Sequence, residues 1–170
     1  MSPEGPNIQQ QIRLPNLNDP RLLLRAIIGG VLVLGIVIIF ILKNSDLLNP
    51  PKAVLGDKTF TVAVADDSQE QMKGLSGKDS LSKDRGMVFV FEKPDNYSFW
   101  MKGMKFPIDI IFIKDDKIVK IYEDVKPPKE NEGLPIYQTP RPADKVLEIR
   151  GGLSKEYKFK EGQSVEFKNI

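Results

Sequence analysis

An uncharged apolar segment near the start of the chain constrains this protein more than any other feature. The segment covers residues 26–42, with Arg25 directly before it and Lys43 directly after it. As an α-helix rising about 1.5 Å per residue it spans roughly 25 Å. Extended back to Leu22 it reaches about 30 Å, the thickness of a bilayer core, if the Arg25 side chain extends to the headgroups. The segment therefore predicts one helix that crosses a membrane.

A retained anchor explains this segment better than a cleaved signal sequence. A signal sequence has an apolar stretch of about 7 to 15 residues and small residues at its cleavage point. Here the apolar stretch is longer, a long N-terminal segment precedes it, and the polar residues 43–46 follow it. We therefore expect a disordered cytoplasmic tail at residues 1–18, a transmembrane helix at residues 19–43, and contact with the lipid bilayer through residues 22–42. A buried core helix would need a larger domain than this chain supplies.

Basic residues near the ends of the helix favour an amino terminus inside the cell. The numbers of basic residues on the two sides of the helix are equal, but Arg21 and Arg25 both lie close to the helix end. This orientation would place the C-terminal domain on the outer side of the cytoplasmic membrane. Ala26 and Gly30 have a spacing that lets such helices pack closely, but the spacing is common by chance, so we do not expect dimerisation through them.

The composition excludes whole classes of site, because the chain has neither cysteine nor histidine. A disulfide framework, a thiol nucleophile, a Ser-His-Asp triad and the usual zinc ligands are all ruled out. Acidic and basic residues nearly balance over residues 50–170, so we expect no nucleic-acid partner. We also expect no metal and no cofactor. Any chemistry falls to carboxylate, lysine, tyrosine or serine side chains.

The rest of the chain predicts a single mainly β domain. A Pro-containing linker at residues 44–53 precedes residues 54–170, which are enough for one globular unit. Asp67 and Glu70 have the spacing of a capping box and predict the start of a short helix. We expect an α+β fold with a small barrel-like or sandwich-like sheet and one or two short helices, with strands at residues 54–55, 60–64, 87–91, 97–101, 108–113, 118–122, 146–149 and 164–167.

A long proline-containing segment at residues 126–142 interrupts the predicted strands. It contains Tyr137, which we expect to be exposed. Loops of this length are uncommon in compact domains and often act in binding. Two interpretations stay open, a lid over a site and a stiff connection.

Asp109 is the most unusual residue by context, since it interrupts an apolar strand and shares a face with Ile111. Burial would favour an acid role for it, while Lys102 or Arg85 nearby would hold it ionised. The structural alternative is a carboxylate that accepts backbone N–H groups and fixes the turn at residues 103–107. Both interpretations stay open, and Asp109 is a catalytic candidate under the first of them.

Glu148 is a second, weaker catalytic candidate. Its neighbours alternate as in a half-exposed strand, which predicts a solvated face for Glu148. If Asp109 and Glu148 nevertheless converge, the two carboxylates could act as acid and base on a glycosidic bond or bind a hard cation.

Trp100 lies in a cluster of large apolar side chains with Phe99, Met101 and Met104. Such groups usually fill a core. The alternative is an apolar cleft with Trp100 as its floor and Lys102 at its edge, covered by the loop at residues 126–142, which would suit a sugar or peptide. The candidate ligand-binding residues are therefore Trp100, Met101, Lys102, Arg85 and Tyr137.

The chain resembles a widespread family known as domain of unknown function 192. The resemblance is carried by residues 73–75, by residues 85–91 and above all by FWMKGMKFPIDIIFI at residues 99–113. It implies a compact, mainly β domain, frequently exported or membrane-attached, with no established reaction. Ser76 stands where the family commonly has Met, Lys73 where it has Arg, and Gly103 where Asn commonly follows Trp-Met-Lys.

Three functions are compatible with these features. The leading hypothesis is a membrane-anchored binding or accessory module of the cell envelope, whose partner is an envelope glycan, peptide or protein. The second is a carboxylate-dependent envelope hydrolase, and the third is a structural or assembly partner without a small ligand.

Overall fold

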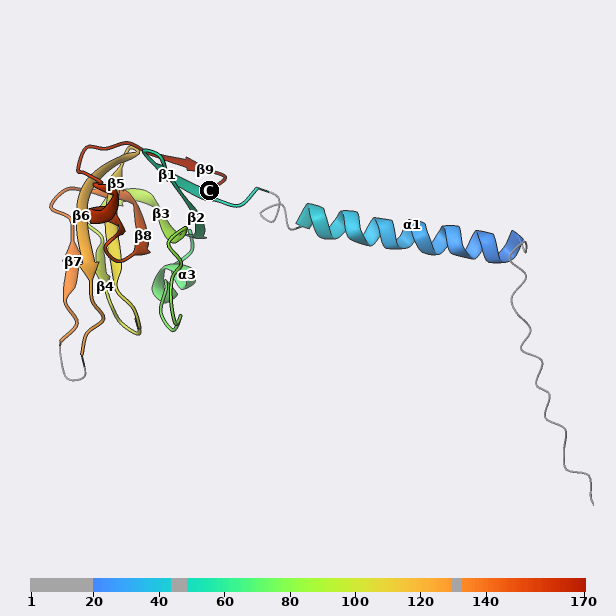
Figure 1. Cartoon of the computed structure of the whole chain (residues 1–170), viewed down its shortest axis with the longest axis horizontal. Helices are drawn as coiled ribbons and strands as arrows, with labels where there is room; N and C mark the ends of the chain where they lie inside the picture. Colours follow the sequence, from blue (N-terminus) through green and yellow to red (C-terminus); the bar gives the residue numbers. More distant parts are fainter. Residues whose placement is uncertain (1–19, 44–48, 130–132) are drawn as a thin grey trace, which may run out of the picture. The chain divides into compact units, whose positions relative to one another are not determined.

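The structure is a computed structural model that describes residues 20–43, 49–129 and 133–170. The chain divides into two units, Met1–Ser45 and Asp46–Ile170, and each is described here by itself (Figure 1). The predicted tail at residues 1–18 and residues 44–48 of the predicted linker lie outside the described residues.

The first unit contains one helix, α1 (Pro20–Lys43). Residues Pro20–Leu42 are long enough and apolar enough to span a membrane, and none of them is buried. Proline suits the first turn of a helix, where its missing N–H has no carbonyl to bond. Helix α1 thus has the length and composition of the predicted transmembrane segment.

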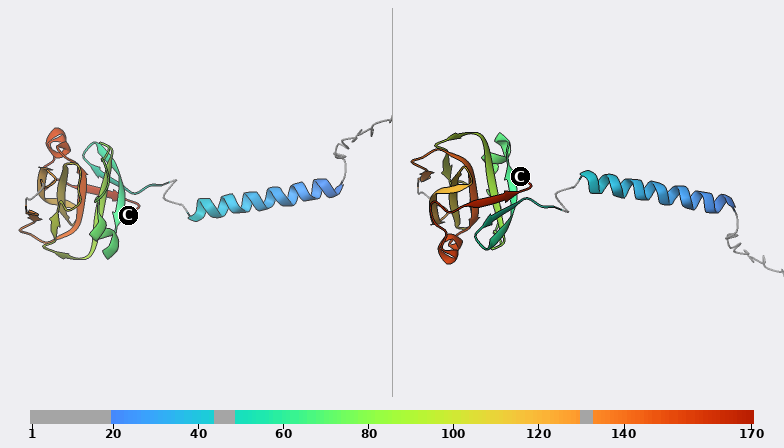
Figure 2. Two further views of the ribbon diagram at one scale, coloured as in Figure 1. Left: turned by 90° about the horizontal axis from the view of Figure 1, so that it is seen from below. Right: turned by 90° about the horizontal axis from the view of Figure 1, so that it is seen from above.

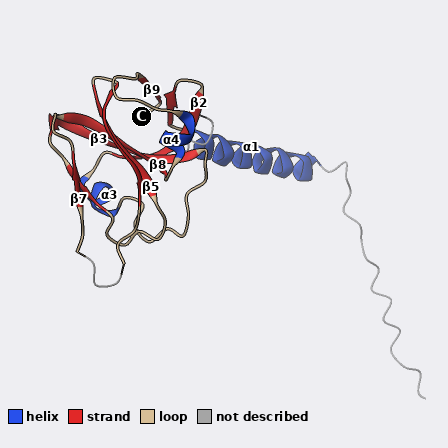
Figure 3. Ribbon diagram, turned by 60° about the vertical axis from the view of Figure 1, so that its left-hand side comes forward, coloured by secondary structure: helices blue, strands red, loops and turns tan. Residues whose placement is uncertain are grey.

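The second unit is a curled seven-stranded sheet with few short helices, which confirms the predicted mainly β fold (Figure 3). Strand order is β6-β5-β8-β3-β2-β1-β9, and all neighbours are antiparallel except β2 and β3. The strands are β1 (Lys52–Leu55), β2 (Lys58–Ala65), β3 (Arg85–Asp95), β5 (Ile108–Lys114), β6 (Lys117–Val125), β8 (Ala143–Arg150) and β9 (Val165–Lys168).

The sheet curls into a half-barrel whose two outer strands come close at one corner (Figure 2). Lys117 of β6 forms a bridge with Ser164, directly before β9. The Ile118 N–H donates to the Gln163 carbonyl at 2.9 Å, and the Ile118 carbonyl accepts from the Gly162 N–H at 2.7 Å. These bonds join the start of β6 to the chain segment that enters β9.

Local sequence signals explain one turn and one helix. Asp115 and Asp116 both adopt positive φ, 49° and 55°, in the two-residue turn between β5 and β6. Helix α3 (Ser68–Lys73) begins where predicted, since the Asp67 carboxylate accepts the N–H groups of Gln69 and Glu70 at 2.8 Å. The same helix ends at Gly74, at φ 48°.

Both faces of the central strands β3, β5 and β8 are covered. One face packs against β1, β2, β9 and the short helix α4 (Leu153–Tyr157). The other face packs beneath α3 and a small second sheet of β4 (Ser98–Trp100) and β7 (Ile136–Gln138). This second layer forms the surroundings of the candidate site.

Three details differ from the sequence prediction. Strand β3 is longer than the predicted residues 87–91 and includes Pro94. Its pairing with β8 is irregular between Val90 and Asp95, and a proline is tolerated where ladder bonds are interrupted. The segment 126–142 contributes β7, which pairs with β4. Helix α4 was not predicted, because it is too short to show a periodic apolar pattern.

Candidate functional site

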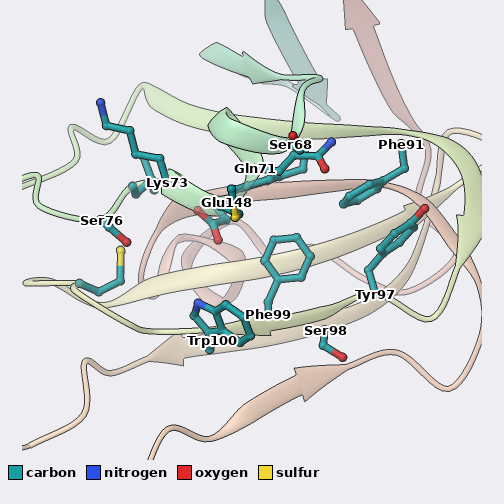
Figure 4. A pocket seen from close by; sticks show the side chains of 15 residues that line it. Ser68, Gln71, Lys73, Ser76, Phe91, Tyr97, Ser98, Phe99, Trp100 and Glu148 are labelled. Atoms are coloured by element: carbon teal, nitrogen blue, oxygen red, sulfur yellow. The ribbon is translucent and has the colours of Figure 1, made fainter.

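A pocket of about 280 Å³ lies between α3, β3, β4 and β8 (Figure 4). Five aromatic side chains, from β3, from β4 and from the turn between them, line it: Phe89, Phe91, Tyr97, Phe99 and Trp100. Helix α3 and the residues after it contribute Gln71, Met72, Lys73 and Ser76, among others. The lining is mainly apolar with a few polar groups, the usual composition of a small-molecule site.

Glu148 is the carboxylic acid that reaches this pocket from the centre of the sheet. It lies on β8, opposite Met87 of β3 and Ile110 of β5, and it is only 6% exposed. The prediction of a solvated face for Glu148 is therefore wrong. The alternation of apolar and polar residues along this strand indicated one solvent-exposed face, but α3, β4 and β7 cover that face.

The Glu148 carboxyl has no compensating partner within the described part of the chain, since no described residue donates a hydrogen bond to it or pairs with its charge. Figure 4 shows the carboxyl between side chains of α3 and those of β4. Burial alone raises the pKa of Glu148 to about 8. At neutral pH the carboxyl is therefore mainly protonated.

Three other polar side chains of the pocket are already engaged. The Gln71 amide donates to the Val90 carbonyl at 2.9 Å, and the Ser76 hydroxyl donates to the Lys102 carbonyl at 2.7 Å. The Tyr97 hydroxyl donates to the carbonyl of Lys93, also at 2.7 Å. The hydrogen-bonding capacity of Glu148 is thus left for a group that enters the pocket.

Large apolar side chains surround the pocket mouth. Trp100 is 53% exposed although it is the largest apolar residue of the predicted cluster, whereas its neighbour Met101 is buried. Met72 of α3 is also exposed. Ile136 of β7 pairs with Trp100 and adds a further exposed apolar group beside the mouth. The cluster around Trp100 is therefore divided between core and pocket rim.

Four of the five predicted ligand-binding residues lie elsewhere. Arg85 lines a different surface hollow, and Lys102 is exposed outside the pocket. Met101 belongs to the core. Tyr137 is half-buried, contrary to the exposure we expected, because its ring packs against Tyr122 with centroids 5.2 Å apart. Trp100 alone of this set lines the pocket.

Sequence reasoning missed the residues of α3 and β3 that complete the pocket. Phe89 and Phe91 alternate along β3 and could have indicated an aromatic face. Nothing in the sequence indicates that Met72 and Gln71 lie across from them, because this depends on how α3 crosses over the sheet.

Asp109 lies on the opposite face of the sheet from this pocket. It pairs with Ile149, whereas Glu148 pairs with Ile110, so the two carboxyl groups point to different sides and form no joint site. The Asp109 carboxylate accepts backbone N–H groups from Asp124 at 2.6 Å, from Gly152 at 2.8 Å and from Ser154 at 2.6 Å.

These bonds give Asp109 a structural function. They tie the end of β6 and the first turn of α4 to the central strand β5. We expected a backbone-accepting role as one alternative, but at the turn of residues 103–107, and the observed partners are distant in sequence.

Residues 52–167 match the sequence profile of domain of unknown function 192, described as an uncharacterised ACR. The chain belongs to this family. A search of curated proteins finds no match. The matched residues of domain of unknown function 192 thus run from the start of β1 into β9.

Two crystal structures are similar to this member of the family. A protein of unknown function from Novosphingobium aromaticivorans is 33% identical, with a TM-score of 0.62 over 68% of this chain and 83% of the other. A protein from Sinorhizobium meliloti described as a candidate transcription regulator is 27% identical. Its TM-score is also 0.62, over 69% of this chain and 91% of the other. The likeness concerns the domain and names no reaction.

Proposed function

We propose that this protein is a membrane-anchored binding module of the cell envelope whose ligand enters the pocket between α3 and β4. The observation that carries this proposal is the Glu148 carboxyl, buried at the base of an aromatic pocket without a partner in the described structure. Hydrogen bonds from a ligand group to this largely desolvated carboxyl would favour binding.

The pocket combines one polar group with apolar walls. Apolar walls supply most of the affinity of a small-molecule site, and a few polar groups orient the ligand. Exposed Trp100 and Met72 at the mouth extend the apolar surface to solvent, where an incoming ligand would first make contact.

Helix α1 supports the anchoring part of the proposal. It has the length and the composition of a single membrane span, and the basic residues before it favour an amino terminus inside the cell. The domain would then lie on the outer side of the cytoplasmic membrane. Reporter fusions at the two ends test this: a periplasm-active reporter is expected to work at the C-terminus and to fail at the N-terminus.

A fragment screen tests the binding part of the proposal. The full chain is placed in lipid nanodiscs, with empty nanodiscs as the blank, and fragments are followed by the emission of Trp100, the only tryptophan. We expect hits whose affinity falls in Phe91→Ala, which removes a pocket wall. Phe167→Ala is the matched control, since this half-buried phenylalanine lies on β9 against the other core.

Two results would argue against a binding module. One is a screen in which no fragment changes the Trp100 emission. The other is a set of hits that bind Phe91→Ala as tightly as the wild type.

The second candidate function is acid–base catalysis by Glu148. Its pKa of about 8 is close to neutral pH, where a side chain is best able to donate and accept a proton. The predicted hydrolase with two carboxylates has no support in the geometry, so Glu148 would act alone. Turnover by the wild type but not by Glu148→Gln, with ligand still bound by the variant, would favour catalysis over simple binding.

A further inference from the structure

The base of the pocket offers a ligand one carboxyl group and aromatic surface. Among the pocket side chains described above, Gln71, Ser76 and Tyr97 use their donors within the protein. The Lys73 chain extends away from Glu148 (Figure 4). Besides the hydroxyl groups of Ser68 and Ser98, the carboxyl and the rings of β3 and β4 remain for a ligand inside the pocket.

We propose that the pocket selects an organic cation, a ligand whose protonated amine pairs with Glu148 and whose apolar part lies against Phe99 and Trp100. This inference rests on the proposed function, that the pocket is a binding site. It adds the chemical class of the ligand.

An ammonium group complements both features of the pocket base. It brings hydrogen-bond donors and a positive charge to a carboxylate that has neither nearby, and charge-assisted hydrogen bonds are about twice as strong as neutral ones. Ring faces carry negative charge density and attract cations by about 0.5–2 kcal/mol. An anion would gain no such attraction, because the ring faces carry negative charge density.

Binding of a cation also predicts a proton release. The carboxyl is mainly protonated in the free protein at pH 7, because burial raises the pKa of Glu148 to about 8. An ammonium ligand favours the ionised form, so the proton leaves to solvent on binding. The other titratable residues that line the pocket are Lys73 of α3 and Tyr97 after β3, and neither contributes to the shift of the Glu148 pKa.

Two small probes of equal shape separate cation recognition from apolar binding. 2-Phenylethylammonium is compared with 2-phenylethanol on the full chain in nanodiscs, with empty nanodiscs as the blank and Trp100 emission as the readout. We expect the amine to bind about tenfold or more tightly than the alcohol. Calorimetry in two buffers of different ionisation heat at pH 7 should show release of a proton with the amine and none with the alcohol.

Two variants locate the effect. Glu148→Gln is expected to abolish both the preference for the amine and the proton release while still binding the alcohol, which shows that the pocket is intact. Glu166→Gln, an exposed carboxyl of β9 that pairs with Lys168, is the control and should behave as the wild type.

The possible failures are distinguishable. Equal affinity for both probes, tighter binding of the alcohol, or an amine preference that survives in Glu148→Gln would each overturn cation selection while leaving the pocket a binding site. Failure of both probes, when other fragments bind and depend on Phe91, would overturn it as well. If no fragment binds at all, the proposed function fails together with this inference.

Discussion

Asp109 and Glu148 occupy neighbouring positions of two paired strands, yet their carboxyl groups lie in opposite layers of the domain. Three backbone N–H groups bind the Asp109 carboxylate, whereas no described residue donates to Glu148. The same change of acid to amide should therefore have opposite consequences at the two positions.

Asp109→Asn should destabilise the domain. An amide offers one acceptor oxygen in place of two, and its NH₂ group would face backbone N–H donors in a fully buried site. We expect a loss of about 2–4 kcal/mol in the free energy of unfolding, measured by urea denaturation at pH 7. Asp79→Asn, at an exposed side chain, should cost no more than about 1 kcal/mol. Equal effects at the two positions would contradict the structural role of Asp109.

Glu148→Gln should become progressively more stable than the wild type as the pH rises. Because the folded pKa of about 8 exceeds the ordinary value of 4.5, the folded wild type holds a proton that the unfolded chain has lost between these two values. Wild-type stability therefore falls across this window by about 1.4 kcal/mol per pH unit and levels off above it. Glutamine does not titrate.

Urea denaturation of both proteins between pH 4 and 9 measures this difference. The two stability curves should run parallel below about pH 4.5, diverge up to about pH 8 and run parallel again above it. Curves that stay parallel throughout would show that the carboxyl is solvated or paired.

Trp100→Ala should reduce ligand binding far more than stability. Since about half of this side chain is exposed at the pocket mouth, we expect a loss of at most about 1 kcal/mol in stability. Phe112→Ala, in the fully buried core beneath, should cost about 3–5 kcal/mol. Thermal unfolding followed by far-UV circular dichroism measures both, since this signal does not need the tryptophan. A large stability loss in Trp100→Ala would mean that Trp100 is a core residue.

Val33→Lys tests the anchor. A lysine near the centre of α1 should raise the free energy of membrane insertion by about 3 kcal/mol, whereas Leu22→Lys, at the end of the helix, can extend its charge to the headgroups and should cost much less. Alkaline extraction of membranes measures the bound fraction. If Val33→Lys and the wild type stay equally membrane-bound, α1 does not hold the protein in the bilayer by insertion.

Local signals were enough to predict much of the fold. The hairpin of β5 and β6 follows from two apolar runs around Asp115 and Asp116, and the start of α3 follows from Asp67. Both features depend on residues a few positions apart. The unusual position of Asp109 was also visible, because a carboxylate on an apolar face needs donors, but those donors come from residues distant in sequence.

The candidate site could not be predicted in the same way. Glu148 lies in an alternating pattern that any strand with one solvent-exposed face would show. Its burial depends on α3, β4 and β7, which come from three separate regions of the chain. Strand β7 was hidden in a proline-containing segment with little apolar periodicity. The burial of Glu148 therefore results from tertiary packing and not from a local sequence pattern.

The pairing of β9 with β1 has a consequence for synthesis of the protein. Residues 52–55 hydrogen-bond residues 165–168, so the first strand of the domain has the last strand, β9, as one of its two neighbours. A nascent chain that ends before β9 leaves that edge of β1 unpaired and the corner beside β6 open. Completion of the sheet therefore has to wait until β9 has left the ribosome.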